Sequence, residues 1–182
     1  MFKFVKWTLI VLGLLIALGI ALAIAGVGDT TDKHKARRHA KAKGTRSKPI
    51  PLHEAARIGG GWRLRVLSVT RNANGLVSEK PPAGAQAFIA RVALTYKGGG
   101  KDSAGALVKS EINAMGAHRA RYDYGSDSCV GYSGLNEAGD VYSGRTVRGN
   151  MCFQIAANDA RSLMLYTGGG FTSTKRVWFA LR

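Results

Sequence analysis

The sequence predicts one all-β domain, an antiparallel β-sandwich, preceded by an apolar N-terminal segment and a basic linker. Short stretches in which apolar and polar residues alternate recur along residues 58–182, and Gly, Pro and Asn gather between them. No amphipathic helix interrupts them. Alternation with a period of two is typical of half-buried strands, and many short strands without helices favour a sandwich. Residues 58–182 are long enough to build one hydrophobic core.

The N-terminal segment predicts a membrane anchor. Residues 7–27 form a run of 21 residues without a charge, and a helix of that length spans roughly 30 Å, the thickness of a bilayer's hydrocarbon core. Lys3 and Lys6 precede the run, as in a signal anchor. The run is longer than the h-region of a cleaved signal, about 7–15 residues. We therefore expect an uncleaved signal anchor, a transmembrane helix, over residues 1–28; cleavage would give a secreted domain.

Residues 29–57 are expected to be a disordered or extended basic linker, because they hold few large apolar residues. The net charge of the chain is +16, and it is divided equally. Residues 1–49 contain 10 basic and 2 acidic side chains, whereas residues 50–182 contain 17 and 9. Such a charge favours anionic partners. The linker would contact anionic lipid or an anionic envelope polymer, or it is only a solvated spacer.

The first strands of the domain are predicted at residues 62–70 and 85–97. Large apolar and polar residues alternate in the first stretch, and a turn-rich stretch follows at residues 71–75. The second stretch is the strongest strand. It places Phe88, Ala90, Val92, Leu94 and Tyr96 on one face and Arg91, Thr95 and Lys97 on the other. Three glycines at residues 98–100 end this strand.

The later elements are less regular. Residues 107–124 predict one or two strands around a turn at Met115 and Gly116. Residues 147–155 alternate again, with Val147, Met151, Phe153 and Ile155 directed inward. Residues 163–166 and 177–181 predict two closing strands, and residues 158–161 a single helical turn. The glycine runs have no dinucleotide-binding or P-loop context, since no strand–helix alternation surrounds them.

The two cysteines, Cys129 and Cys152, predict a disulfide if the domain is exported. Closing a loop of 23 residues would stabilise the fold by roughly 3 kcal/mol. In a cytosolic chain the same residues would be two buried thiols. The positive-inside rule opposes export, because eight basic residues lie at positions 33–48 and would keep that flank in the cytoplasm. The cysteine pair favours an extracytoplasmic domain.

Several stretches together resemble a known family. The matching residues are Gly-Trp-Arg-Leu-Arg-Val at 61–66, the strand at 88–96, the turn and strand at 144–155, and the terminal residues 177–182. They are similar to the DUF4352 family of bacterial extracytoplasmic domains, which is related to the mycobacterial immunoprotective secreted antigens. The resemblance covers residues 58–182. It implies an immunoglobulin-like β-sandwich outside the cytoplasm, on an anchored or secreted chain, without agreed catalytic residues.

The chain also departs from that family. Many relatives look like lipoproteins, but no cysteine follows the apolar run of this chain. An asparagine is expected after the middle strand, where this chain has Lys97, Gly98 and Gly99. The second departure weakens expectations for the following turn and leaves the sandwich unaffected.

One binding patch is predicted from a local excess of tyrosines beside arginines. It consists of Arg119, Arg121, Tyr122, Tyr124 and Tyr132. Tyrosine and arginine are enriched in recognition surfaces, so these side chains would form an exposed contact surface. Alternatively, the tyrosines are half-buried structural residues of the sandwich.

No catalytic residue, metal ligand or cofactor is predicted. His53 and His118 lack the spacing of a zinc site, and three aspartates, Asp123, Asp127 and Asp140, match no calcium-binding loop. Ser133 lies in a glycine-rich loop without a partner base.

The predicted function is therefore a membrane-anchored extracytoplasmic domain that binds or interacts with the envelope without catalysis. The alternative is a cytoplasmic-facing polybasic protein that binds anionic lipid or nucleic acid. Nucleic acid is disfavoured, because RNA-recognition motifs, zinc fingers and a helix-turn-helix are all missing from the sequence. A weaker alternative is an uncharacterised hydrolase that uses the serine and aspartates near residues 123–140. A protein partner is not identified by the sequence.

Overall fold

The computed structural model describes residues 43–118, 121–132, 134–168 and 175–182. They belong to one compact unit, Ala42–Arg182. The predicted anchor, residues 1–28, and the first part of the predicted linker lie outside the described residues. Within the described ranges, none of the helices is long and apolar enough to cross a bilayer.

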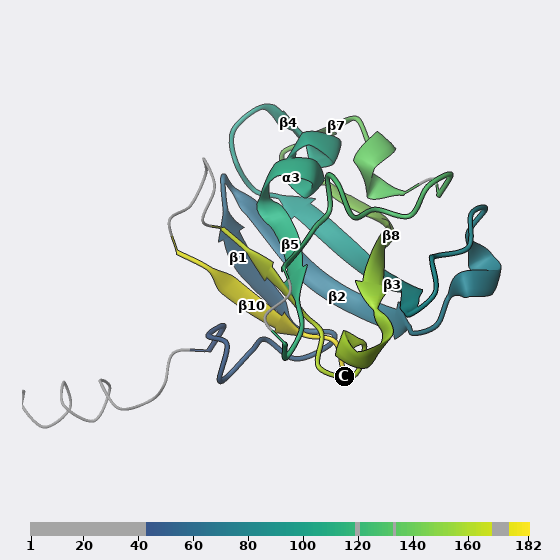
Figure 1. Cartoon of the computed structure of the whole chain (residues 1–182). Coiled ribbons are helices and arrows are strands. Elements are labelled where there is room, and N and C mark those ends of the chain that lie inside the picture. Colours follow the sequence, from purple (N-terminus) through teal and green to yellow (C-terminus); the bar gives the residue numbers. More distant parts are fainter. Residues whose placement is uncertain (1–42, 119–120, 133, 169–174) are drawn as a thin grey trace, which may run out of the picture. The chain divides into compact units, whose positions relative to one another are not determined.

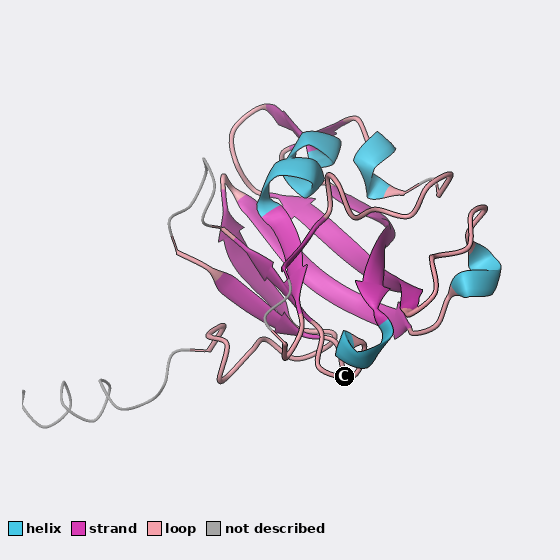
Figure 2. Cartoon of the chain, in the orientation of Figure 1, coloured by secondary structure: helices cyan, strands magenta, loops and turns pink. Residues whose placement is uncertain are grey.

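The domain is built mainly from antiparallel strands, as predicted (Figures 1 and 2). The first sheet has the order β1-β2-β3-β8, with bounds Ala55–Gly59, Trp62–Thr70, Ala85–Tyr96 and Thr146–Ala156. The second has the order β10-β9-β5-β6, with bounds Val177–Ala180, Met164–Thr167, Ile112–Met115 and Arg121–Asp123. A two-stranded sheet joins β4 (Lys101–Ser103) to β7 (Asp140–Tyr142).

The core lies between the two larger sheets. Phe88 of β3 and Phe153 of β8 pack into one buried cluster with Leu165 of β9 and Phe179 of β10, and all four side chains are inaccessible to solvent. The five residues predicted on the inner face of residues 85–97 are all buried, which confirms that face. The alternating pattern sets the fold because each strand buries every second side chain against the opposite sheet.

A short helix corrects the prediction that no amphipathic helix interrupts the strands. Residues 104–111, part of which was expected to be strand, form α3 (Ala104–Glu111). The Ser103 hydroxyl accepts a hydrogen bond from the Ala106 N–H and caps its first turn. Alanine, leucine, lysine and glutamate favour helix in this stretch, but a helix of only eight residues is too short for its apolar period to show. The predicted turn at Met115 and Gly116 is confirmed, since β5 ends at Met115 and β6 begins after it.

The end of the predicted linker is part of the folded domain, which corrects its expected disorder. Ile50 is buried and forms a parallel bridge with Phe179 of β10. The Ile50 N–H donates to the Trp178 carbonyl, and the Ala180 N–H donates to the Ile50 carbonyl, both at 2.8 Å. The Arg46 guanidinium lies 5.4 Å from the centre of the Trp178 ring. This segment follows the edge of β10, and β1 begins at Ala55 rather than after residue 57.

Three short 3-10 turns complete the described part of the fold: η1 (Asn74–Leu76), η2 (Leu135–Glu137) and η3 (Ala157–Asp159). The last of them lies where the sequence predicts one helical turn.

Candidate functional site

The outer face of the first sheet gathers basic side chains from four strands. Residues opposite one another in an antiparallel ladder share a face. Arg57 of β1 is opposite Arg63 of β2, and Arg65 is opposite Ala93, which in turn is opposite Arg148 of β8. We call this surface the arginine face and define it by its six exposed cations: Arg57, Arg63, Arg65, Arg91, Lys97 and Arg148.

The arginine face holds no compensating negative charge. Strands β1, β2, β3 and β8 contain no aspartate or glutamate. None of the six cations forms an ion pair with another residue in the part of the chain that the structure describes. The ion pairs of the domain lie elsewhere, for example between Arg121 and Asp123 or between Lys101 and Asp140. Like charges directly opposite one another, as in the pair of Arg57 and Arg63, destabilise a sheet. This pair therefore does not serve the stability of the fold.

Small and hydroxylated residues form the floor between these cations. The hydroxyl oxygens of Thr95 and Thr146 lie 2.7 Å apart and share a hydrogen bond. Ala93, in the next row of the sheet, has a side chain too short to fill the space between Arg65 and Arg148. The result is a depression of about 220 Å³ over the middle of the face. Its hydroxyl groups and guanidinium groups are all hydrogen-bond donors.

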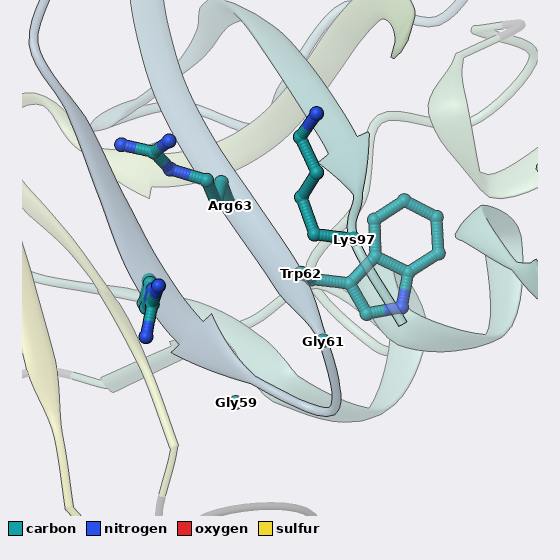
Figure 3. Close-up of a pocket in the computed structure, with 6 residues that line it drawn as sticks. Gly59, Gly61, Trp62, Arg63 and Lys97 are labelled. Carbon is teal, nitrogen blue, oxygen red and sulfur yellow. The ribbon is translucent and has the colours of Figure 1, made fainter. Parts of the chain in front are cut away.

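A second depression, of about 510 Å³, lies where the β1–β2 hairpin turns (Figure 3). Arg63 and Lys97 line both depressions, so the two are neighbours on one surface. Gly61 in the turn has φ +79°, and a Cβ atom there would lie 2.8 Å from the Gly98 backbone. Only glycine fits this close approach without strain.

Trp62 supports the second depression from below. Its side chain is 1% exposed, and its ring packs against the Tyr96 ring with centroids 4.9 Å apart. Its indole N–H donates a 2.8 Å hydrogen bond to Asp102 Oδ2. The turn therefore rests on a fixed aromatic pair.

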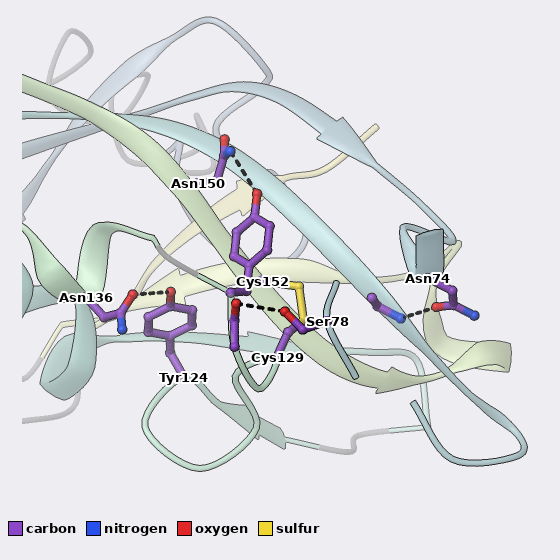
Figure 4. Close-up of a disulfide and its surroundings, with 10 residues drawn as sticks. Asn74, Ser78, Tyr124, Cys129, Asn136, Asn150 and Cys152 are labelled. Carbon is purple, nitrogen blue, oxygen red and sulfur yellow. Dashed lines mark hydrogen bonds between the residues drawn. A yellow bond between two sulfur atoms is a disulfide. The ribbon is translucent and has the colours of Figure 1, made fainter. Parts of the chain in front are cut away.

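The disulfide closes the opposite end of the same sheet face, and it confirms the predicted pairing of Cys129 with Cys152 (Figure 4). Cys152 lies opposite Ile89 on the outer face, and the two Cα atoms of the bridge are 5.4 Å apart. The bridge packs in a small apolar cluster with Ala73, Ala87 and Ile89. The bridge therefore holds the loop around Cys129 over this end of the sheet.

The predicted tyrosine and arginine patch is not one surface. Tyr122 and Tyr124 are buried, at 8% and 3% exposure, so their side chains are structural. Arg121 is exposed on β6 of the second sheet and pairs with Asp123 at 2.9 Å. Tyr132 does approach the arginine face, since its hydroxyl accepts a 2.9 Å hydrogen bond from Asn150, the residue opposite Arg91. Arg119 lies outside the described residues.

The two buried tyrosines have specific partners. The Tyr122 hydroxyl donates to Asp159 Oδ2 at 2.9 Å and accepts from the Ala156 N–H at 3.1 Å. The Tyr124 hydroxyl bonds with Asn136 Oδ1 at 3.3 Å. Burial is the main cause that raises the pKa of Tyr122, and burial raises the pKa of Tyr124 to about 12.

The other residues considered as metal ligands or catalytic groups do not come together in one site. His53 and His118 are both exposed, and Asp140 pairs with Lys101 in the two-stranded sheet of β4 and β7. Asp123 and Asp127 cap the backbone of their own loop. Ser133 lies outside the described residues. In the described ranges, no group of three or more His, Cys, Asp or Glu side chains is placed to hold a metal ion.

The arginine face was missed by sequence reasoning, although part of its signal is visible. Arg63 and Arg65 alternate with apolar residues in one strand, which places them on one face. Their approach to Arg57, Arg91 and Arg148 depends on strand order and register, which a single sequence does not reveal.

The chain is similar to several solved β-sandwich proteins. One is MPT63, a secreted protein of Mycobacterium tuberculosis, at 13% identity and a TM-score of 0.46; the match covers 72% of this chain and 98% of that one. Another is an uncharacterised β-sandwich protein of Clostridium difficile, at 12% identity, a TM-score of 0.46, and coverage of 74% and 95%. A third is the putative lipoprotein YcdA of Bacillus subtilis, at 13% identity, a TM-score of 0.44, and coverage of 68% and 37%.

No protein-family model matches the sequence, the DUF4352 model included, and the curated proteins give no significant match. The resemblance to that family therefore stays a prediction.

Proposed function

We propose that this chain is a membrane-anchored, non-catalytic binding protein whose immunoglobulin-like sandwich lies outside the cytoplasm and binds an anionic partner through the arginine face. One observation carries the proposal: six exposed cations lie on one sheet face whose strands contain no carboxylate, and none of the six forms an ion pair with another described residue. Unpaired cations on one surface create a positive electrostatic potential, which attracts anions and raises their association rate.

The extracytoplasmic location is supported by the disulfide. Structural disulfides persist in oxidising compartments and are rare in reducing ones, and Cys129 and Cys152 are bonded in this domain. The apolar run at residues 7–27 supplies the proposed anchor. Thiol labelling in intact cells, with and without reductant, tests this part. Two free thiols that a membrane-impermeant reagent cannot reach would favour the cytoplasmic alternative.

Anion binding is tested with the full chain in nonionic detergent. Sodium polyphosphate serves as the probe, and affinity is measured by competition against a labelled polyanion at several salt concentrations. Each cation that neutralises a charge on the polymer releases a counterion, so the affinity should fall steeply with salt. The double variant Arg63→Glu/Arg65→Glu should lose about tenfold or more in affinity, because two attractive contacts become repulsive.

The matched control is Lys80→Glu/Arg161→Glu. It changes the net charge by the same amount at two exposed positions that are not on the four strands. We expect its affinity to stay within about twofold of the unsubstituted chain, since scattered surface charges act weakly. Equal losses in the two double variants would contradict the proposal, because binding would then follow overall charge or the linker.

A further inference from the structure

We propose that the arginine face takes a linear polymer whose charged groups are phosphates and which carries no aromatic rings. This inference rests on the proposed function and specifies the chemistry of its ligand. Three features of the face carry it: its elongated and hollowed shape, its set of donors, and the absence of an exposed aromatic platform on its strands.

The shape suits a chain rather than a single ion or a flat surface. The two depressions share Arg63 and Lys97, which makes one track from the β1–β2 turn to the middle of the sheet. From Lys97 to Arg91 the cations follow the outer side of β3 and its immediate extension. Six residues of strand span roughly 20 Å. A bound polymer would therefore contact several cations at once, and its charges would neutralise them in sequence.

The donors favour phosphate. Guanidinium groups form paired hydrogen bonds with phosphate and carboxylate oxygens, and five of the six cations are arginines. Between them lies the hydroxyl pair of Thr95 and Thr146. Donors on three strands thus approach one place from several directions. A tetrahedral anion presents oxygens in several directions, whereas a planar carboxylate presents two in one plane. Phosphate oxygens are also better acceptors for a neutral hydroxyl than sulfate oxygens.

Nucleic-acid bases find no stacking surface here. Single-stranded nucleic acids bind mainly through a basic groove combined with exposed aromatic rings. Trp62 and Tyr96, the aromatic residues at the depressions, are 1% and 7% exposed and pack against each other. Tyr132, which approaches the Arg91 end of the face, is only partly exposed and is held by its hydrogen bond with Asn150. The face offers contacts to a phosphate backbone without contacts to its bases.

A lipid bilayer fits the face less well than a polymer. Peripheral binding is strengthened when apolar side chains enter the headgroup region. The exposed large hydrophobic residues of the described chain are Leu76, Val130 and Tyr142, and none belongs to β1, β2, β3 or β8.

The experiment compares four competitors on the full chain in nonionic detergent: polyphosphate of defined length, polyglutamate, dextran sulfate and oligothymidylate, each matched in number of charges. Vesicles of phosphatidylcholine with phosphatidylglycerol form a separate arm, with the chain reconstituted in nanodiscs. We expect polyphosphate to bind about fivefold or more tighter than polyglutamate and dextran sulfate, the factor that one extra hydrogen bond supplies. Oligothymidylate should bind no more tightly than polyphosphate, and affinity should rise with chain length until the polymer spans the track.

The variant Thr95→Val/Thr146→Val tests the hydroxyl pair without changing charge or, to a first approximation, shape. It should reduce the preference for polyphosphate to about twofold or less and leave polyglutamate affinity unchanged, since hydrogen bonds to the hydroxyl pair would be lost. Thr70→Val is the control, because Thr70 is exposed on β2 but lines neither depression. It should keep the full preference.

The outcomes separate this inference from the proposed function. Suppose that Arg63→Glu/Arg65→Glu lowers the affinity for every competitor, while the unsubstituted chain binds polyglutamate or dextran sulfate as tightly as polyphosphate. Anion binding then stands and the phosphate assignment is wrong. Tighter binding of oligothymidylate or of vesicles would overturn the non-aromatic polymer as well. If no competitor distinguishes the arginine variant from the unsubstituted chain, the proposed function itself fails.

Discussion

The indole N–H of Trp62 donates to Asp102 Oδ2 across 2.8 Å, and this bond connects the first sheet to the two-stranded sheet of β4 and β7. Trp62 is almost fully buried below the depression at the β1–β2 turn, whereas Asp102 lies at the surface. The bond therefore lets a polar group of the core reach an acceptor at the protein boundary. It also fixes the Trp62 ring, which packs against the Tyr96 ring and lines that depression.

Replacing Asp102 tests that relationship. Asp102→Ala should lower the free energy of unfolding by about 1–3 kcal/mol, because the buried indole N–H would lose its acceptor. Asp102→Asn keeps an oxygen at the same place and should cost less. Urea unfolding followed by circular dichroism measures both. Equal stability of the alanine variant and the unsubstituted chain would show that water replaces the carboxylate.

The glycine of the β1–β2 turn gives a second prediction. Gly61→Ala should destabilise the domain by more than about 1 kcal/mol, since its φ is +79° and the new Cβ would lie 2.8 Å from the Gly98 backbone. Gly99→Ala is a matched control in the same region, because nothing lies within 4 Å of a Cβ there. Thermal unfolding of the two variants should rank them clearly. Similar midpoints would mean that the turn rearranges at little cost.

The disulfide gives a third prediction. Replacing both Cys129 and Cys152 by alanine should lower the free energy of unfolding by roughly 3 kcal/mol, the chain-entropy value for a loop of their 23-residue separation. The loop near Tyr132 should also become less protected in hydrogen exchange, whereas strands β5 and β9 should retain their protection. Loss of protection throughout the domain would instead make the bridge a condition of folding.

Alkaline pH gives a fourth prediction. Burial raises the pKa of Tyr124 to about 12, above the value of about 10 for an unfolded tyrosine. The unfolded state therefore loses this proton first. The associated stability is fully present below pH 10 and is lost as the pH rises toward 12. Urea midpoints measured across this range should fall, and the fall should be smaller in Tyr124→Phe. Absorbance at the tyrosinate band should show late-titrating tyrosines in the folded protein.

Strand positions were predictable because apolar and polar residues alternate along each of the longer strands. Residues 62–70 match β2 without a shift, and residues 85–97 match β3 to within one residue. The clear alternation of these two paired strands therefore predicts a large part of the core. The β4–β7 pair, of three residues per strand, is too short to show such alternation. The helix α3 was missed for the same reason of length.

Side-chain burial in the loops was not predictable from composition. Tyr122 and Tyr124 appeared as a dense group with neighbouring arginines, but each turns inward to a polar partner, Asp159 or Asn136. Those partners lie 37 and 12 residues away in sequence. The arginine face was not predicted, because its members are spread in the sequence from Arg57 to Arg148 and only strand pairing brings them onto one surface.

The segment that runs along β10 protects an otherwise open strand. The backbone of Gly44 and Ile50 occupies hydrogen-bonding positions that Trp178 and Ala180 would otherwise leave free at the sheet edge. An uncovered edge of this kind is a template for pairing with a second molecule. A polypeptide shortened to begin at residue 55 would keep all of β1 but present that template, together with the side chain of Trp178, over which Arg46 lies in the folded domain. Its self-association would then reflect a missing cover, not a weak core.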